Sequence, residues 1–182
     1  ISSWTANLRE VNVDGQKIGC DIRTTDFQER VKRLQLSGEG ERARKEIEQI
    51  RAHFPEKDQG AVNIMTARFL INEGMVAEAL ALLVRNYPTQ KSDFNYLTSL
   101  GNAAARAGEY QTAVGAYEKA TALSPGSRRG REALFQAAFL SYQFQDYDGA
   151  VRKFTQLVEA HPRSGLARDA QYGPTDTRDD QP

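Results

Sequence analysis

Apolar residues recur along most of the chain at the spacing of an α-helix. In the two clearest segments they lie at i, i+4 and i+7 or at i, i+3 and i+7, as in Phe27, Val31 and Leu34 and in Ile47, Ile50 and Phe54. This spacing places the apolar side chains on one face of a helix. We therefore predict amphipathic helices that bury these faces against one another.

A short turn sequence that ends in alanine recurs four times. The copies are Gly-Glu-Gly-Glu-Arg-Ala at 38–43, Gly-Met-Val-Ala-Glu-Ala at 74–79, Gly-Glu-Tyr-Gln-Thr-Ala at 108–113 and Gln-Asp-Tyr-Asp-Gly-Ala at 145–150. We expect Gly38, Gly74 and Gly108 to supply the positive φ that ends the first helix of each pair. The alanine that opens the second helix lets two backbones approach closely.

Prolines recur with the same period, at Pro55, Pro88, Pro125 and Pro162. Because proline cannot continue a helix, each is predicted to stop the second helix of a pair. One such helical hairpin cannot bury its apolar face alone, so we expect the hairpins to stack.

The repeat resembles the tetratricopeptide repeat (TPR) family, whose period is about 34 residues. Its best copy contains Leu97, Leu100, Gly101, Gly108, Tyr110, Ala113, Tyr117, Ala120 and Pro125. The resemblance places repeats near 24–57, 60–93, 94–127 and 131–164. It implies an all-α fold, a right-handed superhelical solenoid of about four helical hairpins that binds proteins and is not an enzyme.

The N-terminal segment 1–23 has a different pattern. Val11 and Val13 alternate with polar residues before Asp14-Gly15, and this combination predicts a short β-hairpin or an extended arm. Trp4 is a candidate anchor for it. A terminus that packs against nothing is the alternative.

The C-terminal segment 161–172 reads as the start of a further repeat, either a partial fifth repeat or a capping helix within an array spanning 24–172. Its Pro-x-Ser…Ala-x-x-Ala-x-Tyr spacing is similar to repeats of bacterial envelope proteins, including Tol–Pal accessory and outer-membrane assembly lipoproteins and the helical part of some lytic transglycosylases. Residues 173–182 are polar and contain proline, and we expect a disordered tail there.

Composition narrows the classes of partner. The net charge is zero, so no global field favours nucleic acid, and the densest basic cluster, Arg128, Arg129 and Arg131, is too short to indicate it. No apolar run is long enough to predict insertion into a membrane.

One cysteine, Cys20, permits no intramolecular disulfide and leaves the periplasm and the cytoplasm both open. The chain begins with Ile1 rather than methionine, so we expect a fragment or a processed form.

No pattern of catalytic, metal-binding or cofactor-binding residues stands out. His53 and His161 precede repeat-ending prolines and lack further ligands at metal-binding spacing. Cys20 lacks a nearby histidine, and Gly38-Glu39-Gly40 lacks the lysine and hydroxyl residue of a phosphate loop. We therefore expect neither an active site nor a cofactor.

The resemblance also implies a partner-binding groove lined by the first helix of each hairpin. Carried onto this sequence, the groove positions are Arg68, Asn72, Asn95, Asn102, Arg106, Phe135, Phe139 and Tyr142. Arginine and asparagine bind peptide groups and carboxylates, and the aromatic residues form an apolar pocket. The alternative for the three aromatic residues is packing beneath a fifth repeat or cap. The lysine and asparagine set that clamps chaperone tails is incomplete, so a C-terminal chaperone tail is disfavoured.

The sequence leaves three alternative functions open. The first is a scaffold or adaptor that binds a peptide or partner helix, with a role in assembling a bacterial envelope complex. The second is the non-catalytic helical portion of a larger enzyme such as a lytic-transglycosylase-like protein. The third is an array that associates with itself through its C-terminal end face.

Overall fold

The computed structural model describes residues 11–13, 16–18, 24–53, 59–165 and 167. The chain forms two compact units, Ile1–Leu82 and Leu83–Pro182. The predictions that concern Trp4, Cys20, Pro55 and the tail 173–182 lie outside the described residues.

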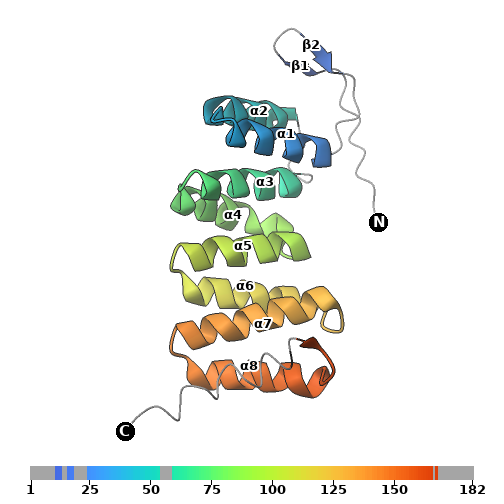
Figure 1. Ribbon diagram of the computed structural model, residues 1–182, viewed down its shortest axis with the longest axis vertical. Helices are drawn as coiled ribbons and strands as arrows, with labels where there is room; N and C mark the ends of the chain where they lie inside the picture. Colours follow the sequence, from blue (N-terminus) through green and yellow to red (C-terminus); the bar gives the residue numbers. More distant parts are fainter. Residues whose placement is uncertain (1–10, 14–15, 19–23, 54–58, 166, 168–182) are drawn as a thin grey trace. The chain divides into compact units, whose positions relative to one another are not determined.

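The first unit begins with two short strands, β1 (Val11–Val13) and β2 (Gln16–Ile18). They pair antiparallel, with Val11 opposite Ile18 and Val13 opposite Gln16 (Figure 1). These strands flank the Asp-Gly pair from which the sequence predicted a hairpin, although residues 14–15 lie outside the description.

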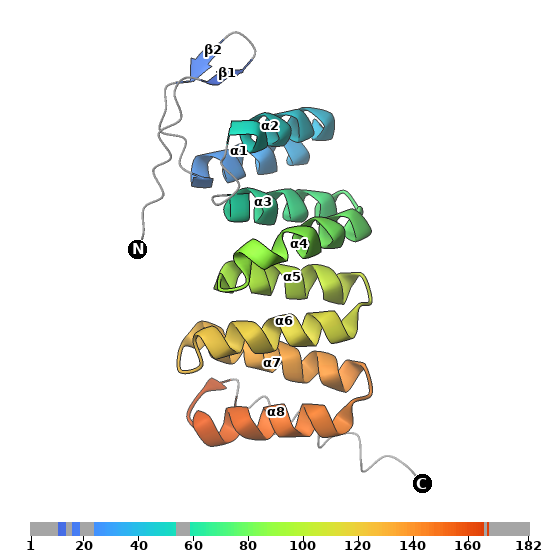
Figure 2. The same ribbon diagram turned by 180° about the vertical axis from the view of Figure 1, so that it is seen from behind.

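The rest of the described chain is helical (Figure 1). The helices, in chain order, are α1 (Thr24–Leu36), α2 (Gly40–His53), α3 (Gln59–Asn72), α4 (Val76–Gln90), α5 (Phe94–Arg106), α6 (Tyr110–Leu123), α7 (Arg128–Gln143) and α8 (Tyr147–Ala160). Successive helices pair as antiparallel hairpins, as α5 with α6 and α7 with α8 show in both views of the second unit (Figures 1 and 2).

A left-handed residue ends the first helix of every hairpin. Gly38, Gly74 and Gly108 have φ values of 80°, 81° and 78°, which confirms the prediction made from the turn sequence. In the fourth turn Gln145 takes this conformation, with φ 66°. The residue that follows each closes the turn by a backbone hydrogen bond back into the helix, for example Glu109 N to Ala104 O at 2.8 Å. This is the bonding of a Schellman motif, in which glycine is the favoured residue.

Small residues bring paired helices together. Ala43, Ala79, Ala113 and Ala150, which were predicted to allow close approach, have exposed fractions of 0%, 0%, 0% and 2%. In the second unit Gly101 of α5 packs directly against the ring of Tyr117 on α6. Burial of this ring raises the pKa of the Tyr117 phenol.

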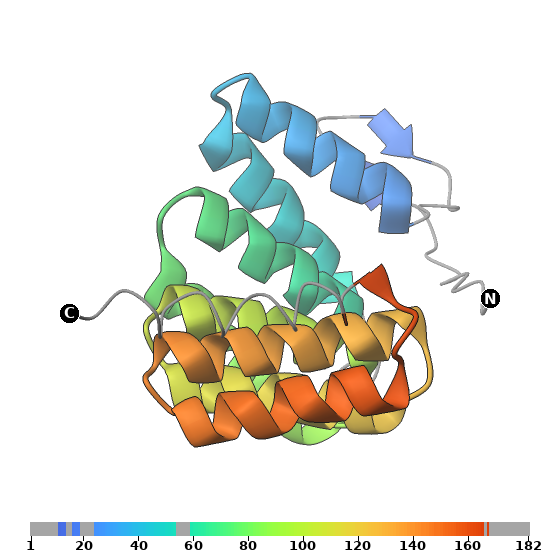
Figure 3. The same cartoon turned by 60° about the horizontal axis from the view of Figure 1, so that its bottom comes forward.

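Three helices of the second unit, α5, α7 and α8, begin with a side-chain cap. Asp93, Ser127 and Asp146 cap α5, α7 and α8 by accepting a hydrogen bond from the backbone three residues on. Tyr96 is fully buried, and its hydroxyl donates to the Leu83 carbonyl at 2.8 Å. The core between α7 and α8, which lie side by side in Figure 3, contains Leu134, Ala138, Ala150, Phe154 and Leu157.

The prediction that Pro88 stops its helix is wrong, because α4 continues through it to Gln90. Proline removes one backbone donor, but its fixed φ still suits a helix. Near the end of α4 that single loss leaves the last residues helical, and Asp93 N then bonds to Gln90 O at 3.0 Å. Pro125 and Pro162, by contrast, follow the ends of α6 and α8.

Candidate functional site

The first helices of the hairpins carry polar or aromatic residues in one shared register. Lys32, Arg68, Asn102 and Phe139 each stand the same number of residues before the alanine that opens the second helix of their hairpin. All four side chains are exposed. Since the hairpins repeat the same geometry, a shared register means that the side chains leave equivalent faces of α1, α3, α5 and α7.

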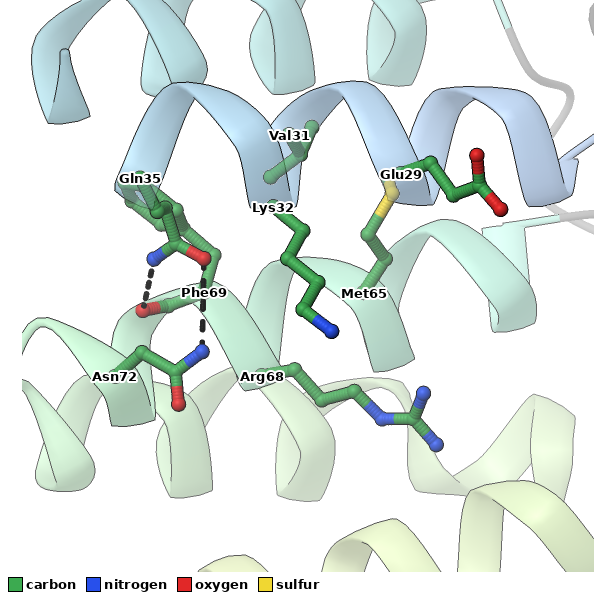
Figure 4. Close-up of a pocket in the computed structure, with 8 residues that line it drawn as sticks. All are labelled: Glu29, Val31, Lys32, Gln35, Met65, Arg68, Phe69 and Asn72. Atoms are coloured by element: carbon green, nitrogen blue, oxygen red, sulfur yellow. Dashed lines mark hydrogen bonds between the residues drawn. The ribbon is translucent and has the colours of Figure 1, made fainter. Parts of the chain in front are cut away.

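In the first unit this register opens a hollow between α1 and α3, of about 340 Å³ (Figure 4). It is lined by Glu29, Val31, Lys32, Gln35, Met65, Arg68, Phe69 and Asn72. Its floor is apolar, because Val31, Met65 and Phe69 are buried core residues of the two helices. A volume of this size accommodates a side chain or a short stretch of peptide.

Amides form one end of the hollow. Gln35 Nε2 donates to the Phe69 carbonyl at 3.4 Å, and Asn72 Nδ2 donates to Gln35 Oε1 at 3.5 Å (Figure 4). Gln35 Nε2 also donates to Glu73 Oε1 at 3.1 Å. These bonds join α1 to α3, so the end of the hollow is fixed by contacts between its two helices. Asn72, one of the predicted groove positions, lines this hollow.

The charged groups of the hollow are Glu29, Lys32 and Arg68. Lys32 and Arg68 reach from their helices into the hollow, whereas the Glu29 carboxylate points to its far side (Figure 4). Among the described residues neither cation makes an ion pair, in contrast to Arg30, whose Nη2 lies 2.8 Å from Glu46 Oε1. The lining of the hollow thus carries two positive charges and one negative charge, and the Glu73 carboxylate lies at its amide end, where it accepts from Gln35.

A second hollow, of about 240 Å³, lies among α2, α3 and α4 of the same unit. Its charged groups include a pair across it, Arg44 Nη2 and Glu78 Oε2 at 3.7 Å. This pairing leaves less charge available to a partner than the hollow between α1 and α3.

The three groove positions expected on α5 lie exposed on the helix but are partly engaged by other side chains. Arg106 Nε donates to Asn102 Oδ1 at 3.1 Å, which ties two of these residues together. Arg129 Nη2 donates to Asn95 Oδ1, and the Arg129 guanidinium stacks 4.5 Å above the Phe94 ring. A partner at α5 would meet these pairs rather than free amides.

The three aromatic positions on α7 differ from one another. Phe135 and Tyr142 are half-buried and pack against the core between α7 and α8, and Phe135 meets Phe154 edge-on with ring centroids 5.7 Å apart. Phe139 is the one whose ring is largely open, with an exposed fraction of 43%. Of the three, Phe139 is therefore the one best placed to meet a partner.

Sequence reasoning missed Lys32, Gln35 and Glu29, because groove positions were transferred only onto the second, third and fourth repeats. The signal was present in the register itself, since Lys32 precedes Ala43 by the same interval that separates Arg68 from Ala79. Arg129 was weighed only as part of a basic cluster, and its contact with Asn95 depends on the helix packing.

The described residues hold no cluster of histidine, cysteine, aspartate and glutamate that could bind a metal ion. Within the same part of the chain, no helix combines the length and the apolar character needed to cross a bilayer.

Comparison with known proteins identifies the repeat. Residues 132–164 match the family model of a tetratricopeptide repeat. A search of curated proteins gave no match.

Solved structures extend the likeness over most of the chain. The nearly identical TPR-like repeats of a Podosopora anserina kinesin light chain superpose with a TM-score of 0.68 at 20% identity, covering 82% of each chain. A tetratricopeptide repeat protein from Parabacteroides merdae gives 0.64 at 19%, covering 81% of this chain and 57% of that one. YrrB, a TPR protein with an unusual peptide-binding site, gives 0.60 at 18%, covering 81% and 74%. These likenesses confirm the predicted fold class, a helical solenoid of TPR hairpins.

Proposed function

We propose that this chain, whose fold is that of tetratricopeptide-repeat proteins, is a non-catalytic scaffold that binds a segment of another protein along the first helices of its hairpins. Stacked repeats of this kind present extended concave surfaces for binding. The observation that carries the proposal is the hollow of about 340 Å³ between α1 and α3, with its apolar floor and two cations that make no ion pair with the described residues. YrrB, which shares the fold, is a TPR protein with a peptide-binding site.

The proposed contact residues are those of the first helices in both units. In the first unit they are Arg68 and Asn72, joined by Lys32 of the same hollow. In the second they are Asn95, Asn102, Arg106 and Phe139, together with Phe135 and Tyr142, which pack partly against the core of the hairpin. We assign each unit its own binding surface.

Site-specific photo-crosslinking tests this proposal. A photoreactive residue is placed at Asn72, Asn102 or Phe139, and matched controls carry it at exposed positions of second helices, Gln111 and Gln156. After irradiation in a lysate of the source cells, adducts are identified by mass spectrometry. The proposal predicts one shared partner from the first-helix positions and none from the controls. Equal adducts from both sets, or none from either, would contradict it.

Self-association is a second candidate, favoured by a specific surface at the C-terminal hairpin. Phe144, Tyr147 and Val151 lie near the turn between α7 and α8 with exposed fractions of 49%, 54% and 47%. Apolar side chains gathered in this way often mark interfaces. Sedimentation equilibrium would show a mass that rises with protein concentration, and Phe144→Ser/Tyr147→Ser would abolish the rise. A constant monomer mass excludes this function.

The proposed role in a bacterial envelope complex is supported by the motif between Pro162 and Tyr172. In its described part, Ser164 Oγ accepts a hydrogen bond from Ala167 N at 3.1 Å, and Ala167 is buried. This bond from the backbone three residues on is the kind that a serine makes at the start of a helix. Fractionation of the source cells tests this role, because an envelope scaffold must be found outside the cytoplasm.

A further inference from the structure

We propose that the hollow between α1 and α3 recognises a single acidic side chain, the Asp or Glu of an extended peptide segment, and holds its carboxylate between Lys32 and Arg68. This inference rests on the proposed function and adds the chemistry of the partner. It is carried by the charges, the floor and the amide end of that hollow.

The two cations suit one carboxylate. Lysine offers a compact charge with three donors, and arginine offers a planar fork that matches the two carboxylate oxygens. They come from different helices into one hollow (Figure 4). Neighbouring arginines in the first unit are already engaged, Arg30 by Glu46 and Arg44 by Glu78. Lys32 and Arg68 have no such partner among the described residues, so their donors are available to a ligand.

Glu29 restricts what can bind. It lines the same hollow, and its carboxylate points away from the Lys32 amine (Figure 4). A second acidic residue of the partner that reached toward Glu29 would be repelled, because like charges at short distance disfavour each other. The hollow therefore favours a partner segment with a single acidic residue over a segment with several acidic residues in succession.

The apolar floor of the hollow determines which type of residue the partner carries near its Asp or Glu. Met65, a flexible side chain that adapts to different shapes, lines the floor with Val31 and Phe69. In an extended peptide, side chains two residues apart point to the same side. The fitting segment thus has an apolar residue two positions from its Asp or Glu.

The hollow also offers a hydrogen-bond acceptor to the backbone of such a segment. Asn72 donates through its Nδ2 to Gln35 Oε1 at 3.5 Å, which leaves its side-chain oxygen as a separate acceptor. That oxygen can accept from a peptide N–H, since an asparagine amide both donates and accepts.

Selection from a phage-displayed library of random peptides tests the inference. The targets are the full wild-type chain, Lys32→Met/Arg68→Met, and the control Arg33→Met/Lys45→Met. The control loses the same charge from exposed positions of α1 and α2 outside the hollow. We expect the wild type and the control to enrich peptides with one acidic residue, and the hollow variant to lose this preference. Thermal unfolding of all three verifies that the exposed substitutions leave the fold intact.

Titration of a selected peptide then isolates the charge pairing. Replacing its Asp or Glu by the amide should weaken binding to the wild type about fivefold at low salt, the size expected of a solvent-accessible ion pair. The same replacement should leave binding to Lys32→Met/Arg68→Met unchanged, and added salt should reduce the wild-type preference.

The outcomes separate this inference from the proposed function. Peptides selected without an acidic preference, or an equal loss for both protein variants, overturn the inference and leave the scaffold proposal standing. Enrichment of polyacidic tracts overturns the assignment of a single carboxylate. A library that yields no binding peptide at all overturns both.

Discussion

A Cβ atom added to Gly101 of α5 would stand 2.8 Å from Cε2 of Tyr117 on α6. The two helices approach this closely because position 101 has no side chain. Tyr117 is buried, so its ring has little room to move away.

Gly101→Ala is predicted to destabilise the second unit by about 1–3 kcal/mol, because overpacking outweighs the gain in helix propensity. Gly115→Ala is the matched control. A Cβ at Gly115 of α6 meets no atom within 4 Å, so this change should stabilise by up to about 1 kcal/mol. Urea unfolding of both variants measures the difference, and a stabilised Gly101→Ala would contradict the close packing.

Gln145→Gly is predicted to stabilise the protein by about 0.5–1 kcal/mol. Gln145 holds a left-handed conformation, φ 66°, that costs a residue with a Cβ but not glycine. Gly108→Ala, at the equivalent place in the preceding turn, should destabilise by a comparable amount. Thermal melts of the two variants test the pair, and shifts of the same sign in both would refute the explanation.

Asn63→Leu is predicted to stabilise the first unit by about 1–2 kcal/mol. Asn63 is buried in α3, and its Oδ1 makes no hydrogen bond in the part of the chain described. A leucine removes this unsatisfied acceptor, whereas Asn63→Asp would bury a charge and should destabilise. Chemical denaturation distinguishes the two, and a destabilised Asn63→Leu would reveal a polar contact that the leucine cannot make.

The repeat and its turns were predictable because they depend on local chemistry. Gly38, Gly74 and Gly108 have the positive φ expected of them, and Ala43 and Ala113 are buried as expected. A turn conformation and a helix period are each determined by the types of a few neighbouring residues, so a single sequence reveals both.

The details that a single sequence does not reveal depend on tertiary context. Pro88 lies inside α4 because a proline near the end of a helix removes only one of the few backbone hydrogen bonds that are still made there. Phe135 and Tyr142 carry the same kind of side chain as Phe139, yet only packing against α8 shows that they are partly core. Lys32 and Gln35 become site residues only once α1 and α3 lie next to each other.

The most direct test of the scaffold proposal is an amide NMR titration of the isotopically labelled chain with a peptide selected against it. The account predicts that shift changes concentrate in the first helices, above all around Lys32, Arg68 and Asn72 for an acidic peptide. Shift changes concentrated in the second helices α2, α4, α6 and α8 would contradict it, because the binding surface would then lie on the opposite helices of the hairpins.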